Sequence, residues 1–209
     1  MNAPNSAYVN KWSAGADYGP VLTQTDLYLL KPKVQINPIL TREGTSFSVV
    51  FDIATGSATG FNDQSPGDFP FTQGAEPATL PRMKELYIIS PESPWCTTVR
   101  NDGGVTLQDV FSAVWKDYTE HPITDAEIAA CPPRVQEVIK RYSMSSQQAA
   151  YQIYSPAPPR LRRIGESSPP VDWLRDRHMF DSMSINDVYA EQRLGFSAPN
   201  VLFMRVANY

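Results

Sequence analysis

The chain has few of the residues that bind transition metals or act as catalytic nucleophiles. Its 209 residues include two cysteines, Cys96 and Cys131, and two histidines, His121 and His178. Neither pair has the close spacing of a zinc site. The sequence also lacks a Gly-x-Ser-x-Gly nucleophile elbow and a Gly-x-x-x-x-Gly-Lys phosphate loop. We therefore predict neither a metal site nor a cofactor.

Long apolar runs are missing as well. No segment approaches the roughly 20 apolar residues that cross a bilayer, and residues 1–12 lack the apolar core of a signal peptide. Two cysteines in 209 residues are too few for a disulfide framework. We expect Cys96 and Cys131 to be free thiols, with a disulfide between them as the alternative. A cytoplasmic location and no membrane partner follow from these absences.

Charge of either sign is scarce, because charged residues make up 19% of the chain and the formal net charge is −4. A protein whose main partner is nucleic acid needs clustered Lys and Arg to neutralise phosphates. The mildly acidic balance therefore argues against nucleic acid as a partner. Hydrophobic residues make up 42%, as in a globular chain, and the 19 prolines favour long ordered loops over long helices.

The clearest local pattern lies between residues 77 and 118. This segment reads as strand, turn, strand, glycine turn and helix, with β-branched and aromatic residues enriched at 84–90 and Gly103-Gly104 at the second turn. Thr106 stands at the N-cap position of the helix. The apolar residues of that helix fall on one face, which we expect to be buried against the sheet: Leu107, Val110, Phe111, Val114, Trp115 and Tyr118.

The order of the remaining elements indicates the fold class. Strands are expected at 47–53 and 201–206 and helices after residue 124, whereas residues 54–78 have the composition of a long loop. This order favours an α+β fold, with a small antiparallel or mixed sheet covered on one face by about three helices and with long proline-rich loops. Residues 1–20 are expected to form an extended arm, and residues 21–209 a single α+β domain.

One polar group contains a histidine and could carry acid–base chemistry. Asp172, Asp176, His178 and Asp181 lie close together in the sequence. His178 could act as a general acid or base that a neighbouring carboxylate orients. A salt-bridged surface turn without catalytic function explains the same residues.

The segment 160–177 is rich in arginine, whose planar guanidinium suits carboxylate or phosphate recognition. We predict a docking patch for an acidic protein or an anionic ligand. Internal pairing with nearby Asp and Glu is the alternative. The arginines are Arg160, Arg162, Arg163, Arg175 and Arg177.

Several short motifs are spaced as in a known family. They are INPIL at 36–40, FD at 51–52, PATLP at 77–81, PW at 94–95, VTLQDV at 105–110 and VDWL at 171–174, followed by Phe180. Through them the chain resembles a domain family of unknown function that is abundant in agaricomycete (mushroom-forming) fungi. The chain departs from the family pattern at Phe51 and Phe203, where the family would have Trp. The resemblance implies a fungal, intracellular, single-domain protein and adds no substrate and no active residue.

These observations favour a non-catalytic intracellular protein-interaction or scaffold module, because no chemical constellation accompanies the well-specified core. One alternative is a hydrolase that uses Asp172, His178 and Asp181. Another is a small-ligand or carbohydrate binder that presents an aromatic ring such as Trp12 or Trp95.

Overall fold

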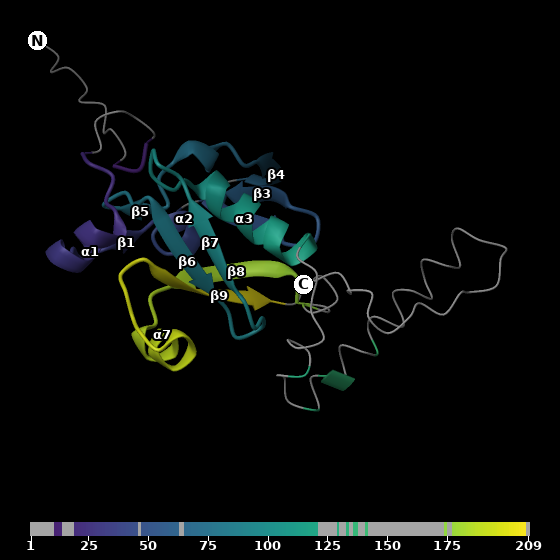
Figure 1. Cartoon of the computed structure of the whole chain (residues 1–209). Coiled ribbons are helices and arrows are strands. Elements are labelled where there is room, and N and C mark those ends of the chain that lie inside the picture. The colour runs from purple at the N-terminus through teal and green to yellow at the C-terminus, as the bar shows by residue number, and fades with distance from the viewer. Residues whose placement is uncertain are drawn as a thin grey trace, which may run out of the picture.

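The computed structural model describes residues 11–13, 19–45, 47–62, 65–120, 174 and 177–207, with a few single positions between 129 and 141 (Figure 1). For residues 65–68 it describes the backbone alone. The elements, in chain order, are α1 (Gln24–Leu30), β1 (Gln35–Ile36), α2 (Pro38–Thr41), β2 (Phe47–Asp52), β3 (Ser57–Asn62), β4 (Ser65–Pro70), the 3-10 turn η1 (Gln73–Ala75), β5 (Thr79–Leu80), β6 (Glu85–Ile89), β7 (Cys96–Arg100), α3 (Leu107–Thr119), β8 (Met179–Ser184), α7 (Asp187–Leu194) and β9 (Val201–Ala207).

Seven strands form one mixed sheet in the order β4-β3-β2-β8-β9-β6-β7. Neighbouring strands are antiparallel except for β6 and β9, which are parallel. A separate two-stranded sheet pairs β1 with β5. The expectation of a small sheet covered on one face by about three helices is therefore wrong. The described part of the chain is mostly sheet with a few short helices, although it still mixes α and β elements.

Two of the additional strands, β3 and β4, come from the segment that the sequence predicted as a long loop. β3 and β4 are built largely from Ser, Gly, Asn, Asp and Pro, which are weak strand formers or occur at strand edges. β3 nevertheless pairs with β2 along its whole length, from Phe47↔Asn62 to Asp52↔Ser57. The backbone ladder of this hairpin fixes the strand, so side-chain composition was a poor guide.

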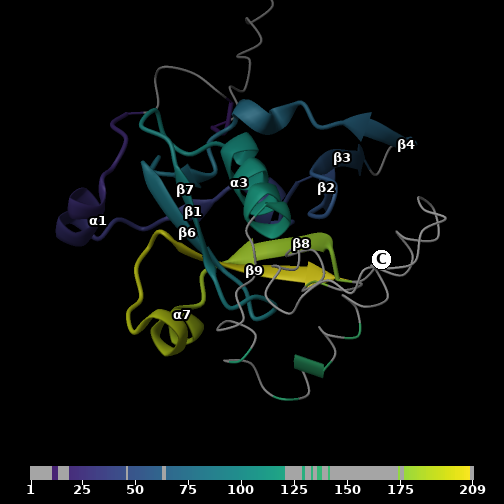
Figure 2. The same cartoon turned by 45° about the vertical axis from the view of Figure 1, so that its right-hand side comes forward.

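The helix α3 covers one face of the sheet, between β7 on one side and β2 on the other (Figure 2). A capping box joins Thr106 and Asp109 at its N-terminus. Most of the expected face is buried, but Trp115 is 38% exposed and packs on Gly56 of the β2–β3 turn. Trp115 lies at the border of the apolar stripe, so its predicted burial was wrong. The buried residues of α3 are Leu107, Val110, Phe111, Val114 and Tyr118.

The opposite face of the sheet carries α7. Side chains alternate between the two faces along a strand. In β6, Leu86 and Ile88 join the large core under α3, whereas Ile89 joins a second cluster with Val201 and with Ala190 of α7. Helices therefore cover both faces, which corrects the expectation of one covered face.

The two halves of the seven-stranded sheet meet where β2 lies beside β8. These strands share a single residue pair, Asp52↔Met179, and the Ile53 N–H donates to the His178 carbonyl at 2.8 Å. On the α3 side, the ring of Phe111 contacts Phe51 of β2 at 4.6 Å and Phe180 of β8 at 5.7 Å between centroids.

Arg42 bridges the same joint beyond the point where the ladder stops. It follows α2 with a left-handed backbone, at φ 59°. Its Nη2 donates to the Val49 carbonyl of β2 at 2.9 Å and to the Phe180 carbonyl of β8 at 3.1 Å. One guanidinium thus satisfies backbone acceptors on two strands that have separated.

Candidate functional site

His178 forms a pair with a carboxylate that the sequence analysis did not consider. Its Nδ1 lies 2.9 Å from Oδ1 of Asp52, which is 126 positions away in the sequence. Asp172 and Asp176 lie outside the described residues. Asp181 instead accepts from the Ser182 hydroxyl and lies 3.8 Å from Arg42. The structure therefore shows a His178–Asp52 pair, and Asp181 belongs to a different interaction.

The β2–β8 joint brings His178 and Asp52 together. Asp52 is the last residue of β2, and His178 immediately precedes β8. Both side chains are partly exposed, at 24% for Asp52 and 35% for His178. The one sequence signal for Asp52 was its place in the FD motif at 51–52, which carried no hint of its partner.

Hydrogen bonds determine the ionisation of Asp52. Burial acts to raise its pKa, but hydrogen bonds from His178, from the Ala54 N–H and from Thr55 outweigh burial, so the pKa lies below its ordinary value. An ionised carboxylate accepts hydrogen bonds only, so His178 donates through Nδ1. Whenever the imidazole carries one proton, the other ring nitrogen, Nε2, is then an acceptor.

This pair has the first two members of a catalytic triad but lacks a nucleophile. In the part of the chain that the structure describes, no hydroxyl or thiol hydrogen-bonds to His178. Nor do three or more His, Cys, Asp or Glu side chains come together there as metal ligands would. The visible role of the pair is to join β2 and β8.

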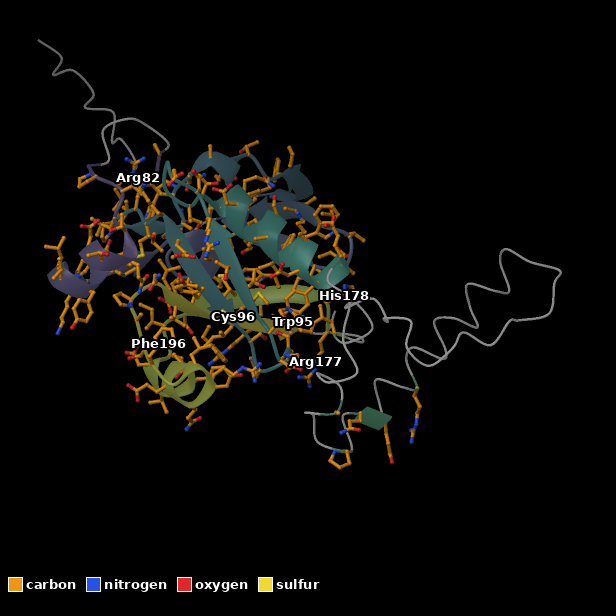
Figure 3. The ribbon with its side chains drawn as sticks, in the orientation of Figure 1. Arg82, Trp95, Cys96, Arg177, His178 and Phe196 are labelled. Carbon is orange, nitrogen blue, oxygen red and sulfur yellow. The ribbon has the colours of Figure 1, made fainter. Side chains whose placement is uncertain are left out.

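Arg177 is the member of the predicted arginine patch that the structure describes. Its Nη1 donates to Oε1 of Glu92 at 2.8 Å, and Figure 3 shows Arg177 and His178 on the chain that leads into β8. Internal pairing, the alternative in the sequence analysis, therefore applies to Arg177. The other predicted members lie outside the described residues: Arg160, Arg162, Arg163 and Arg175.

The two tryptophans considered for carbohydrate stacking differ in burial. Trp12 is 5% exposed and presents almost no surface to solvent. Trp95 is half-buried and stacks edge-on against Tyr118 with centroids 5.0 Å apart. With Cys96, it lines a small cavity of about 300 Å³ at the edge strand β7. Burial raises the pKa of the Cys96 thiol, which makes the thiol less reactive. Cys131 lies outside the described residues.

Two larger cavities lie on either side of Lys11 and Trp12. One, of about 630 Å³, extends over β1 and the end of β8, and the other, of about 560 Å³, extends over η1 and the loop before β2. Both are lined by Lys11, Trp12, Pro38 and Glu43. This region was not predicted as a site, because its lining residues are scattered along the sequence.

The end of α1 exposes three large apolar side chains in a row. Tyr28, Leu29 and Leu30 are 77%, 69% and 65% exposed, while Leu27 of the same helix is 2% exposed. The sequence shows an apolar run at this position, which would normally indicate a buried element. Its exposure was therefore not predictable from the run alone. We call these three side chains the α1 tip.

The comparisons with known proteins identify a family. The sequence model of a family of unknown function, DUF6699, matches residues 49–193, so the chain belongs to that family. This match confirms the resemblance to a domain family of unknown function. It includes Asp52 and His178, whereas Trp12 and the α1 tip lie before its first residue. Comparisons with curated proteins and with solved structures gave no significant match.

None of the helices in the described ranges has the length and apolar character needed to cross a membrane.

The lowered pKa of Asp52 predicts a pH-dependent contribution to stability. A carboxyl whose pKa falls on folding stabilises the protein above its unfolded pKa and loses this effect as pH falls through its folded pKa. At pH 7 we expect Asp52→Ala to lower the free energy of unfolding by about 1–2 kcal/mol. The difference in stability from wild type should shrink as the pH falls below 3.8, the ordinary pKa of an aspartate side chain. Urea unfolding at several pH values measures it, and a difference that is independent of pH would contradict this role.

Proposed function

We propose that this chain, as a member of a family of unknown function, is a non-catalytic protein-interaction or scaffold module that docks through the α1 tip. The observation that carries the proposal is the exposure of Tyr28, Leu29 and Leu30, each at least 65% exposed. Single exposed apolar residues are ordinary, but adjoining ones of this size are typical of interaction sites. Tyrosine is also enriched among the residues that dominate binding energy.

The helix beneath the tip is firmly held, which supports a preorganised docking surface. Thr23 Oγ1 accepts from the Asp26 N–H at 3.2 Å, and Asp26 accepts from the Thr23 N–H at 2.8 Å. Leu27 anchors the helix in the core, and the Lys31 N–H donates to the Leu27 carbonyl at 3.0 Å. The ordered helix therefore presents the tip at a small entropic cost on binding.

Charges beside the tip indicate the chemistry of the partner. Lys31 and Lys33 follow α1 directly and are exposed. Among the described residues neither lysine forms an ion pair. We propose a partner protein with an apolar groove and an acidic rim, because opposite charges at a rim favour encounter and register. The net charge of −4 disfavours an anionic membrane as the target.

We include in this proposal a cytoplasmic location in a fungal cell. The resemblance implies both, and the low cysteine content supports a reducing compartment.

Photo-crosslinking from position 29 tests the docking surface. A photo-crosslinking residue in place of Leu29 should give a discrete protein adduct in cells. Replacing Tyr28 and Leu30 with Ser should abolish this adduct without lowering the melting temperature, because the side chains are exposed. Binding of the identified partner should weaken as salt rises, since the lysine rim is screened.

Val188 on α7 provides the matched control, because it is 68% exposed and lies on another helix. The crosslinker at position 188 should not give the same adduct. Identical adducts from positions 29 and 188, or an adduct that survives the Ser substitutions, would contradict docking through the α1 tip. Cosedimentation with phosphatidylserine vesicles that depends on the tip would also contradict it.

A hydrolase is the second candidate function, and the His178–Asp52 hydrogen bond is the observation that favours it. Here His178 would be the general base that Asp52 orients, with Asp172 and Asp181 as the further carboxylates proposed from the sequence. This candidate predicts turnover of an ester, amide or phosphoester substrate that His178→Ala abolishes while the chain stays folded. Turnover that is absent from such a panel, or unchanged in His178→Ala, would eliminate it.

A further inference from the structure

Trp12 lies between two cavities and lines both of them. Its side chain is 5% exposed, and the cavities of about 630 and 560 Å³ lie on its two sides. Lys11 beside it donates from Nζ to Oε1 of Gln35 at 2.9 Å, and its ammonium lies 5.5 Å from the Trp12 ring centre. A bulky anchor residue flanked by open space is typical of a short segment bound in a longer groove. We call the two cavities together the groove, and the position that Trp12 occupies between them the seat.

The floor of this groove is held in place by contacts that do not involve Trp12. Asn37 donates through Nδ2 to the Pro77 carbonyl at 3.0 Å and to Glu76 at 3.2 Å. Its Oδ1 accepts from the Ile39 N–H at the start of α2. Pro38 and Ile39 therefore keep their positions whether or not the seat is filled. Such a preformed pocket is the usual form of a binding site.

The charges of the groove suit a basic residue next to an aromatic one. Glu43 lines both cavities, and Glu76 lines the second, where burial raises its pKa despite the hydrogen bond from Asn37. Arg205 lines the first cavity, which Glu76 does not line, and its guanidinium lies over Phe203. Lys11 lines the same two cavities as Glu43, although the described residues show no ion pair between them.

We propose that this groove is a binding site for a peptide segment that carries a tryptophan preceded by a lysine, and that Lys11 and Trp12 are its resident occupants. Lys11 and Trp12 show which kinds of side chain fit this groove. A partner segment of the same kind competes with residues 11–13 for the seat and extends into the open space on either side. This inference concerns a surface that is distinct from the α1 tip and does not depend on it.

A labelled peptide of residues 6–18 (SAYVNKWSAGADY) is the probe, tested against full-length chains. It should bind Trp12→Ala about tenfold or more tightly than wild type, because a tethered segment competes at an effective concentration in the millimolar range. The same peptide with alanine in place of its tryptophan should not bind. Fluorescence anisotropy gives the affinities, and circular dichroism checks that each chain is folded.

Trp12→Phe keeps the inference testable if Trp12→Ala does not fold. A phenylalanine fills the seat less completely, so this variant should bind the peptide with an intermediate affinity. Substituting Ser for Tyr28, Leu29 and Leu30 should leave peptide binding unchanged, which separates this site from the α1 tip. A wild-type dimer at high concentration that Trp12→Ala abolishes would support the site and identify a second copy as the partner.

Equal affinity of the peptide for wild type and Trp12→Ala would overturn the proposal, as would no binding to either folded variant. Stabilisation of Trp12→Ala by free indole without peptide binding would also overturn it. That result would mean that the seat is a packing site for the chain's own indole only.

Discussion

The seven-stranded sheet depends on the joint between β2 and β8. Backbone pairing there is limited to Asp52↔Met179 and the bond from Ile53 to the His178 carbonyl. Side chains complete the joint. The Asp52–His178 pair lies at the end of β2, Arg42 donates to carbonyls of both strands, and the ring of Phe111 packs across the α3 side. These contacts join the β4-β3-β2 hairpins to the rest of the sheet, beside the packing of Val49, Phe51 and Ile53 in the core.

This dependence bears on function. The polar group that most resembles an active site, His178 with Asp52, already has a role at the joint, and no described hydroxyl or thiol bonds to it as a nucleophile would. Structural ion pairs also perturb pKa values, so the lowered pKa of Asp52 is not evidence of catalysis. The unexplained features are surfaces instead, namely the α1 tip and the seat of Trp12. The α1 tip and Trp12 itself lie outside the part of the chain that matches the family, whereas Glu76 and Ser182 of the groove lie inside it.

Local patterns in the sequence predicted several helices and strands, but few of the contacts between them. The period of α3 and its Thr106 cap were predicted correctly, as was the strand β9, because those signals lie within one element. Trp115 was misplaced, because a residue at the border of a helix face can lie on either side of it. β3 and β4 were missed, since their strand character comes from pairing with β2. The partner of His178 lies 126 positions away and left no sequence signal.

Hydrogen exchange of the Ile53 amide tests the role of the joint most directly. This N–H donates across the joint to the His178 carbonyl at 2.8 Å. If the joint holds the sheet together, the Ile53 amide should exchange only through global unfolding, as the amides of β6 and β9 do. Arg42→Ala should then lower its protection together with theirs. Exchange of Ile53 through a local opening, with β6 and β9 still protected and no response to Arg42→Ala, would contradict the account.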